Sequence, residues 1–442
     1  MEVMLGQRYV WDTWQPFGLS VADRRQHALL LGKTGMGKST LLRNMIVQDI
    51  AAGRGCLFID PHGDEAERLL DYIPPWRTAD VMYLDLSDLS HPIGLNVIER
   101  EPAHLRSLVA SNIVSTFKHF WSDAWGARSE YLLLCSVAAI LDYPDRQGDV
   151  SLLGVQRIMN DPLYRARVLR FSRNPAVRAF WDQEFPTWPA QFAAQALSPL
   201  QNKLGALLSA PAMRLMLGQA TSTLRIGEAM NERKIIIARL PKGLIGEDNT
   251  NIAGSLLVNA VQHAAMRRAE VPEDERVDFV CYLDEFKNFT TGSFADILSE
   301  LRKYHVGFVL SGQFLGQTQR PIRDAVIGNV GTILAFQVGH DDAEELAPVF
   351  EHGNIDTLTG LDRGEVAARL ISGGEALPPF RGYTYSEIGT RHEGRRAAIL
   401  EQSRRRYGRP RPKVEGRLIR WQTRAEAQPL HHVRQTPRLS VL

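Results

Sequence analysis

A glycine-rich loop lies near the start of the chain, where residues 32–40 read Gly32-Lys33-Thr34-Gly35-Met36-Gly37-Lys38-Ser39-Thr40. The short apolar run before it, Gln26-His27-Ala28-Leu29-Leu30-Leu31, has no helical period and indicates a buried strand. After it, apolar residues recur at helical spacing, which predicts a helix from Ser39 to Ala52. The loop has the form G-x-x-x-x-G-K-[ST] between a strand and a helix, which is the context in which that form binds phosphate.

Each part of this loop has a chemical reason to bind a nucleotide. Its glycines permit positive φ and close approach, so successive backbone N–H groups can surround a β-phosphate at the N-terminus of a helix. We expect Lys38 to bridge the β- and γ-phosphates and the Ser39 hydroxyl to bind Mg²⁺. Residues 32–40 are therefore predicted to hold ATP with Mg²⁺.

Strands and helices alternate outward from the loop. Further strands are predicted at Cys56–Asp60, Val81–Leu86, Lys234–Leu240, Val277–Leu283, Gly307–Ser311 and Thr332–Val338. From about Ala103 to Asn231 the pattern is helical only, and its four tryptophans, Trp121, Trp125, Trp181 and Trp188, are expected to pack in a core rather than stack on bases. The pattern predicts an α/β fold with a doubly wound, mainly parallel sheet, split by an all-α inserted domain.

The chain divides into four predicted segments. Residues 1–102 form the first part of the α/β core, 103–231 the all-α inserted domain, 232–385 the second part of the core, and 386–442 a basic tail. The tail from Arg391 to Leu442 holds 14 Lys and Arg residues and 4 Asp and Glu residues. The rest of the chain holds 38 Lys and Arg residues and 46 Asp and Glu residues, so a basic tail follows a mildly acidic body. Its prolines and charge density predict no packed element there.

Two acidic residues end a predicted strand, in Val280-Cys281-Tyr282-Leu283-Asp284-Glu285. Carboxylates after a buried run are costly unless they face a cation or water at the end of the sheet. Asp284 is the predicted Mg²⁺ contact, and Glu285 is predicted to polarise the attacking water, so the pair favours hydrolysis over transfer to another acceptor.

Two further residues are candidates for the same chemistry. Gln313 follows the strand Gly307–Ser311, where its amide can reach a γ-phosphate or the attacking water. Arg302 ends a predicted amphipathic helix, Ser293 to Lys303. Arg302 is either a favourable charge at a helix terminus or an arginine finger offered to the ATP of a neighbouring subunit.

The composition narrows the class of protein. Of the 442 residues, 44% are hydrophobic and 23% charged, which excludes collagen-like and wholly disordered chains. No run approaches the roughly 18 apolar residues of a membrane span, and no export signal is visible, so we expect a cytoplasmic protein. The three cysteines, Cys56, Cys135 and Cys281, are expected to be reduced core residues.

The basic tail has three interpretations. Its arginines, with Tyr407 and Trp421 interleaved, suit contact with a nucleic-acid backbone and stacking on bases. The alternatives are a solvated tail that aids solubility and one that binds acidic lipid head groups.

Taken together, these motifs resemble the HerA–FtsK superfamily of RecA-like P-loop motors, and within it the type IV secretion coupling proteins and conjugative-transfer ATPases. The resemblance covers roughly residues 20–350 and rests on His27, the loop, Asp60-Pro61-His62-Gly63-Asp64, Leu283-Asp284-Glu285-Phe286, and Arg302-Lys303-Tyr304 before Gln313. It implies a ring of six subunits with ATP at each interface and nucleic acid in the pore. It also implies that Lys38, Glu285, Gln313 and Arg302 act in catalysis, Gln313 as sensor and Arg302 in trans.

The chain departs from the coupling proteins in lacking the transmembrane helices that they normally carry. Either a membrane-anchored partner recruits it to the inner membrane face, or it is a HerA-like translocase without an anchor. The predicted function is an oligomeric ATPase that translocates DNA. The alternatives are an ATPase that powers protein secretion or assembly, and a nucleotide-gated scaffold that recruits a relaxase or nuclease.

Overall fold

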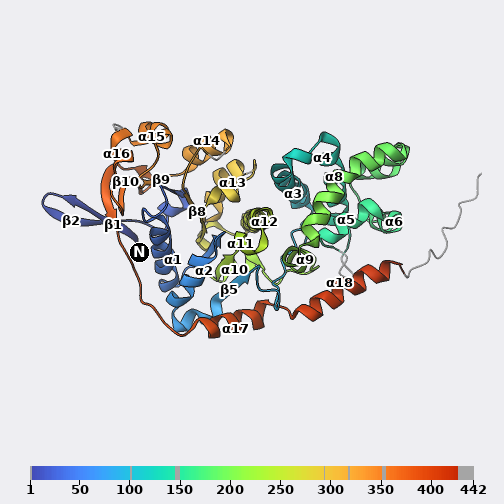
Figure 1. Ribbon diagram of the computed structural model, residues 1–442, viewed down its shortest axis with the longest axis horizontal. Helices are drawn as coiled ribbons and strands as arrows, with labels where there is room; N and C mark the ends of the chain where they lie inside the picture. Colours follow the sequence, from blue (N-terminus) through green and yellow to red (C-terminus); the bar gives the residue numbers. More distant parts are fainter. Residues whose placement is uncertain are drawn as a thin grey trace, which may run out of the picture.

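The computed structural model describes residues 2–99, 102–144, 150–292, 294–316, 319–350 and 355–426. Over these residues the chain forms two lobes, one built on a large sheet and one made of helices (Figure 1). The helical lobe is formed by the chain between α3 (Arg106–Phe120) and α10 (Ile226–Asn231), and the sheet lobe by the chain on either side. None of the described helices is long and apolar enough to cross a bilayer.

Eleven strands of the described chain form one sheet, in the order β2-β1-β13-β10-β9-β3-β8-β7-β4-β6-β5. Seven of them run parallel to one another: β3 (Ala28–Leu31), β4 (Gly55–Asp60), β5 (Val81–Asp85), β6 (Ile235–Arg239), β7 (Phe279–Leu283), β8 (Val306–Gly312) and β9 (Thr332–Ala335). The central strands β3, β4, β7 and β8 are fully buried, as expected where helices cover both faces. The predicted α/β fold with a doubly wound, mainly parallel sheet is confirmed.

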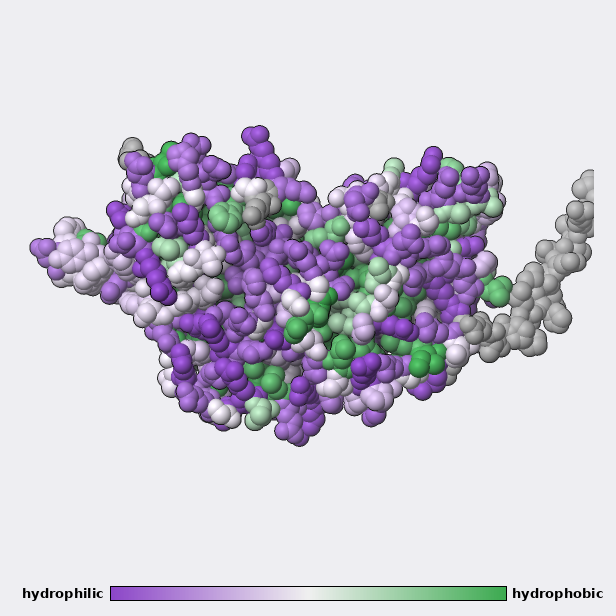
Figure 2. Space-filling model, in the orientation of Figure 1, coloured by the Kyte–Doolittle hydropathy of each residue, from purple (hydrophilic) through white to green (hydrophobic). Residues whose placement is uncertain are grey.

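Four antiparallel strands extend this sheet beyond β9, and the sequence patterns did not predict them. They are β10 (Glu365–Arg369), β13 (Phe380–Thr384), β1 (Val3–Val10) and β2 (Thr13–Leu19), and a small separate pair is formed by β11 (Ile371–Ser372) and β12 (Glu375–Ala376). The β1–β2 hairpin turns at Trp11 and Asp12, with φ of 48° and 58°. Such turns usually carry Asn-Gly or Asp-Gly, so the usual hairpin signal is missing here. The hairpin projects from the body (Figures 1 and 2).

Two buried clusters lie on the two faces of the sheet. Leu30 of β3 packs in the cluster that includes α1 (Lys38–Ala51) and α2 (Asp64–Leu69). Its neighbours Leu29 and Leu31 pack in the other cluster, with α12 (Glu247–Met266) and α13 (Phe294–Leu301). The remaining helices of this lobe are α11 (Lys242–Ile245), α14 (Arg320–Asn329), α15 (His340–Leu346) and α16 (Ile355–Thr359).

The helical lobe has its own apolar interior. Its other helices are α4 (Ala127–Asp142), α5 (Leu152–Asn160), α6 (Pro162–Leu169), α7 (Pro175–Ala179), α8 (Ala190–Ser209) and α9 (Pro211–Leu217). Trp121 and Trp181 are buried, and Trp125 and Trp188 pack against the same core, so the prediction that these rings are structural is confirmed. The three cysteines are free and buried, also as predicted.

Polar side chains join the helical lobe to α12 of the sheet lobe. The Asn112 amide donates to Gln262 Oε1 at 2.7 Å, and the Asn259 amide donates to Thr116 Oγ1 at 2.9 Å. All four side chains are buried, and buried polar groups that are paired fix one arrangement of the helices that carry them.

The prediction of a tail without packed elements is wrong for residues 396–426. These residues form α17 (Arg396–Tyr407) and α18 (Arg411–Glu426), which run along one side of both lobes (Figure 1). We call them the C-terminal strap. The charge of α17 is compatible with packing because Arg396 pairs with Asp71 and Arg404 with Asp88 on the sheet lobe. The rest of the basic tail, residues 427–442, lies outside the described residues.

The prediction that Trp421 and Tyr407 stack on bases is also wrong. The Trp421 ring lies edge-on to Tyr164, with centroids 6.3 Å apart, and the Arg157 guanidinium sits 5.2 Å from its centroid. Tyr407 is half-buried against the main apolar core. Both rings are therefore contacts that hold the strap in place, and neither is free to stack on a base.

Candidate functional site

The glycine-rich loop connects β3 to α1 at the carboxyl ends of the parallel strands. Gly32, Gly35 and Gly37 have φ of 151°, 81° and 121°, and a Cβ at Gly32 would lie 2.6 Å from the Phe336 Cβ. Only glycine tolerates this combination of backbone angle and contact. The loop therefore adopts the conformation that the sequence predicted for phosphate binding, with Lys33, Thr34 and Gly35 exposed and Met36, Ser39 and Thr40 half-buried.

Lys38 is the buried cation of this loop. Its side chain is 7% exposed, and Nζ donates to the carbonyls of Gly32 at 2.5 Å and Lys33 at 3.0 Å. Burial lowers the pKa of Lys38, and the carboxylates of Glu285 and Asp284 oppose that shift. The ammonium thus lies within the electrostatic reach of both acids.

The two acids follow β7, two strands away from β3. Asp284 accepts a hydrogen bond from the Ser311 hydroxyl at 2.9 Å. Burial raises the pKa of Asp284 to about 7, and the nearby charge of Asp60 adds to the shift. Buried carboxylates such as Asp284 and Asp60 can accept a cation.

Glu285 has the features of a strained functional residue. It is 6% exposed and adopts left-handed angles, φ 49° and ψ 54°, which are uncommon for a residue with a Cβ. Its Oε1 accepts from Gln313 Nε2 at 2.8 Å, and its buried Oε2 has no hydrogen-bond partner among the described residues. The free oxygen is available to bind a proton or a water.

The structure thus brings together four of the predicted catalytic and metal-binding side chains at one edge of the sheet: Lys38, Asp284, Glu285 and Gln313. Arg302 does not lie with them. It follows α13 in the turn Arg302–Tyr304, before β8 begins at Val306. Arg302 therefore lies at the amino-terminal end of the parallel strands, opposite the glycine-rich loop. Since the seven residues of β8 span about 20 Å, Arg302 cannot reach the loop of its own subunit.

Arg302 is exposed and lines an open cavity of about 910 Å³ together with Arg25 and Lys303. The predicted amphipathic helix before it is present as α13, and its apolar residues Phe294, Ile297, Leu298 and Leu301 are buried as expected. Because Arg302 is exposed and lies away from the loop of its own chain, it is placed to contact another molecule.

Sequence reasoning missed two residues of this site. Ser311 holds Asp284 through its hydroxyl, and Asp60 affects the pKa of Asp284 from the end of β4. Asp60 also accepts hydrogen bonds from the backbone N–H groups of His62 and Ala66, at 2.8 and 2.9 Å. Ser311 lies two positions before Gln313 at the end of β8, and this alternate spacing could have identified Ser311.

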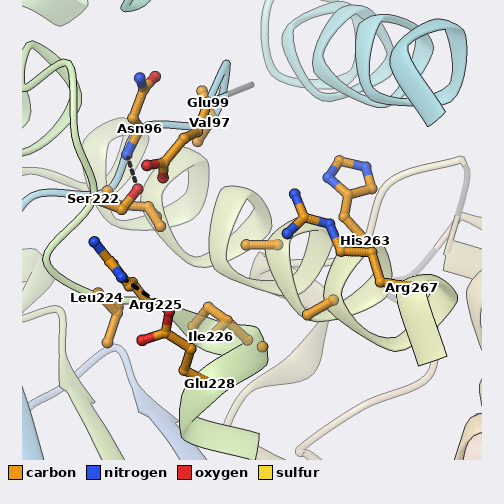
Figure 3. A pocket seen from close by; sticks show the side chains of 14 residues that line it. Asn96, Val97, Glu99, Ser222, Leu224, Arg225, Ile226, Glu228, His263 and Arg267 are labelled. Carbon is orange, nitrogen blue, oxygen red and sulfur yellow. Dashed lines mark hydrogen bonds and ion pairs between the residues drawn. The ribbon is translucent and has the colours of Figure 1, made fainter. Parts of the chain in front are cut away.

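A separate cavity of about 290 Å³ lies where the chain crosses between the lobes (Figure 3). Arg225 and Glu228 form an ion pair at 2.9 Å on one side, and His263 of α12 and Arg267, the residue directly after α12, lie on the other. The backbone N–H of Asn96 donates to the Ser222 hydroxyl at 2.9 Å. Its charges are of both signs, and we assign it no ligand.

Comparison with known proteins agrees with this geometry. Residues 8–118 match the family model described as the central domain of the helicase HerA. The bacterial conjugative coupling protein TrwBdeltaN70, in its unbound form, has a TM-score of 0.61 at 14% identity, with 85% of this chain and 88% of that one covered. The plasmid coupling protein TrwB in complex with ADP and Mg²⁺ has a TM-score of 0.60 at 15% identity. That match covers 84% of this chain and 88% of the other.

Another solved structure has a similar fold. VirB4 of Thermoanaerobacter pseudethanolicus has a TM-score of 0.56 at 14% identity, and the match covers 88% of this chain and 96% of that one. None of the curated proteins matches the sequence. The chain has the RecA-like P-loop fold of these proteins and resembles motors of the HerA–FtsK type.

Proposed function

We propose that this protein is an ATP-hydrolysing motor that assembles into a ring and moves DNA. The observation that carries the proposal is the buried Glu285 carboxylate, held in a strained conformation beside the cation of a phosphate-binding loop with one oxygen unpaired. Such a carboxylate suits a general base for water. Matches to a HerA domain and to a coupling protein solved with ADP and Mg²⁺ support the assignment to nucleotide chemistry.

The residues present fit a magnesium nucleotide. The Ser39 hydroxyl and the Asp284 carboxylate are the hard oxygen ligands that Mg²⁺ prefers, and Asp60 leaves an excess of buried negative charge beside them. When bound, Mg²⁺ would neutralise charge on the phosphate oxygens. Lys38 and the backbone N–H groups of residues 32–40 would hold the phosphates themselves.

The hydrolysis step assigns one role to each remaining side chain. Glu285 Oε2 accepts a proton from the attacking water, and the water oxygen bonds to the γ-phosphorus. The bond between that phosphorus and the β,γ-bridging oxygen breaks, which gives ADP and phosphate. Gln313 donates to Oε1, which keeps the carboxylate oriented with Oε2 toward the water. Lys38 stabilises the charge that develops on the leaving phosphate.

Arg302 supports assembly into an oligomer. It lies at the edge of the sheet opposite its own nucleotide loop, so it is useful for hydrolysis only at the loop of a neighbouring subunit. In a ring, each interface would combine the loop of one subunit with Arg302 of the next. A closed ring is the expected form because such head-to-tail contacts otherwise continue into a filament.

The test is ATP turnover by the purified chain without nucleic acid, with single-stranded DNA and with duplex DNA, at low and moderate salt. We expect stimulation of several-fold by DNA, and loss of turnover in Glu285→Gln with ATP binding retained. Basal turnover without stimulation would contradict DNA as the cargo and favour protein cargo. Unchanged turnover in Glu285→Gln would overturn the proposed site.

A further inference from the structure

The α18 helix of the C-terminal strap carries a row of cations beside its packed face. Val414, Leu418 and Trp421, at positions i, i+4 and i+7, face the helical lobe and are buried or half-buried. Lys413, Arg417 and Arg420 have the same spacing, displaced by one residue, and all three are exposed. On a helix this displacement places the cations on the flank next to the packed face, about 100° around the axis.

These three cations are not used within the chain. Two other cations of the strap form ion pairs, Arg404 with Asp88 and Arg411 with Glu415. Among the described residues, Lys413, Arg417 and Arg420 have no ion-pair or hydrogen-bond partner for their charged groups. Like charges three and four residues apart destabilise a helix, so this row is an unfavourable arrangement unless an anion binds it.

One more cation continues the row toward the sheet lobe. Arg409 donates to Gln219 Oε1 at 3.0 Å. Its pKa is lowered by burial and by the charge of Arg417, while the Glu99 carboxylate opposes the shift, so Arg409 lies near Arg417. The positive charge of α18 thus continues as far as Arg409, whereas Arg225 beyond it is paired with Glu228 at 2.9 Å.

From this arrangement we propose that Lys413, Arg417 and Arg420 form a track for the phosphate backbone of a nucleic acid along the strap. The cations lie about 6 and 4.5 Å apart along the helix axis, so they present an evenly charged line rather than a pocket for one small anion. Trp421 and Tyr407 are packed, so the track contacts phosphates and not bases, and it is independent of sequence.

The packing of α18 favours a nucleic acid over a membrane surface. A membrane-bound helix would turn an apolar face to the lipid, but the apolar face of α18 packs on α9 and Tyr164. Of its large apolar side chains, Ile419 is exposed, at 56%. The proposal rests on the proposed function, in which DNA is the cargo, and it adds a surface outside the nucleotide site that contacts it.

The test measures binding of labelled single-stranded and duplex DNA to the full chain between about 50 and 200 mM salt. In the variant Lys413→Gln/Arg417→Gln/Arg420→Gln, we expect the slope of log K against log salt to become less steep by about 2 to 3. Each of the three lost phosphate contacts contributes roughly 0.7 to 0.9 to the steepness of that slope. Basal ATP turnover without DNA should stay unchanged, since none of the three lies near the nucleotide site.

A matched control removes the same charge elsewhere. Arg170, Arg173 and Arg363 are exposed, and their guanidinium groups have no partner among the described residues, so Arg170→Gln/Arg173→Gln/Arg363→Gln should keep the slope of the parent chain. An unchanged slope in the α18 variant, with DNA binding by the parent chain intact, would overturn the track and leave the motor proposal standing. Absence of DNA binding by the parent chain would overturn both. Loss of binding to phosphatidylglycerol vesicles with an unchanged DNA slope would show a membrane surface instead.

Discussion

His27 is hydrogen-bonded to the carbonyl of Leu298, and this bond ties the strand before the nucleotide loop to the helix before Arg302. The Phe308 N–H donates to His27 Nδ1 at 3.0 Å, so the proton of the neutral ring is on Nε2, which donates to Leu298 O at 2.8 Å. The ring is 2% exposed, and φ at His27 is 61°. A single side chain therefore joins β3, β8 and α13.

Replacing His27 by Leu should destabilise the protein substantially. The substitution leaves the Phe308 N–H and the Leu298 carbonyl without their side-chain partner, and each such buried group costs about 1–3 kcal/mol. We expect the free energy of unfolding to fall by about 2–5 kcal/mol in a denaturant titration. His340→Leu, at an exposed histidine, should change it by less than about 0.5 kcal/mol. A loss in His27→Leu as small as that of the control would contradict the assigned bonds.

The stability contributed by two buried histidines should fall as the pH falls below about 6.5, whereas the raised pKa of Asp284 acts in the opposite direction. Burial lowers the pKa of both His27 and His263 to about 4. Between that value and the ordinary value near 6.5, the unfolded chain binds more protons than the folded one, so acid favours unfolding in this window. Stability from these groups is fully present above about 6.5 and is lost as the pH approaches 4.

The variant His263→Gln isolates one of these groups. Its amide oxygen can still accept from the Asn112 amide, as the His263 ring does at 3.0 Å, but it does not titrate. We expect the slope of unfolding free energy between pH 5 and 6 to decrease by up to about 1.4 kcal/mol per pH unit. His340→Gln, at an exposed ring, is the control and should leave the slope unchanged. An unaltered slope in His263→Gln would show that this ring titrates normally.

The proposed action of Arg302 on a neighbouring subunit can be tested by mixing inactive variants. Lys38→Ala removes the loop cation and Arg302→Ala the distant cation, and each alone is expected to lose about 10³-fold or more in turnover. Mixed rings contain interfaces that join an intact loop to an intact Arg302, so part of the activity should return. Lys303→Ala, at the adjacent exposed cation, should keep most of the activity. Failure of every mixture to recover, in rings shown to mix, would contradict action in trans.

The sequence predicted which side chains of the candidate site lie close together, because each of them lies at a local signal. Lys38 follows a strand within a short glycine motif, and Asp284, Glu285 and Gln313 follow the ends of apolar runs. The carboxyl ends of parallel strands share one edge, so a correct assignment of strands suffices to bring these side chains together. Asp60 was not assigned a role because its effect on Asp284 depends on which strands are neighbours, and strand order is not local.

The C-terminal strap shows what composition cannot predict. Its arginines resemble a solvated tail, but Arg396 and Arg404 meet acidic partners more than 300 residues earlier in the chain. The Tyr83 N–H at the edge strand β5 donates to the Ser403 hydroxyl at 2.8 Å, so α17 also covers a sheet edge. Pairings between segments so far apart leave no periodic signal in either one.

Trp421 is expected to fix α18 to the helical lobe. Its half-buried ring contacts Tyr164 and Arg157, so Trp421→Ala removes a packing contact worth about 1–3 kcal/mol. Hydrogen exchange of the backbone of residues 411–426 should become faster, while that of α12 stays protected. Ile419→Ala on the same helix is the control, because Ile419 is 56% exposed. Equal protection of α18 in the two variants would contradict the role of Trp421.

Gln313 is expected to affect turnover more than nucleotide binding. In Gln313→Ala the Glu285 Oε1 loses its 2.8 Å hydrogen bond, so the carboxylate is free to rotate and Oε2 is no longer held toward the attacking water. Because the phosphates are held by the loop and not by Gln313, kcat should fall by about 10- to 100-fold while the Kd for ATP stays within a factor of about 3. Gln319→Ala, at an exposed amide beyond the site, should leave both constants unchanged. A weaker Kd with an unchanged kcat would instead place Gln313 on the nucleotide itself, and the orientation of Glu285 would then depend on the backbone of its left-handed turn alone.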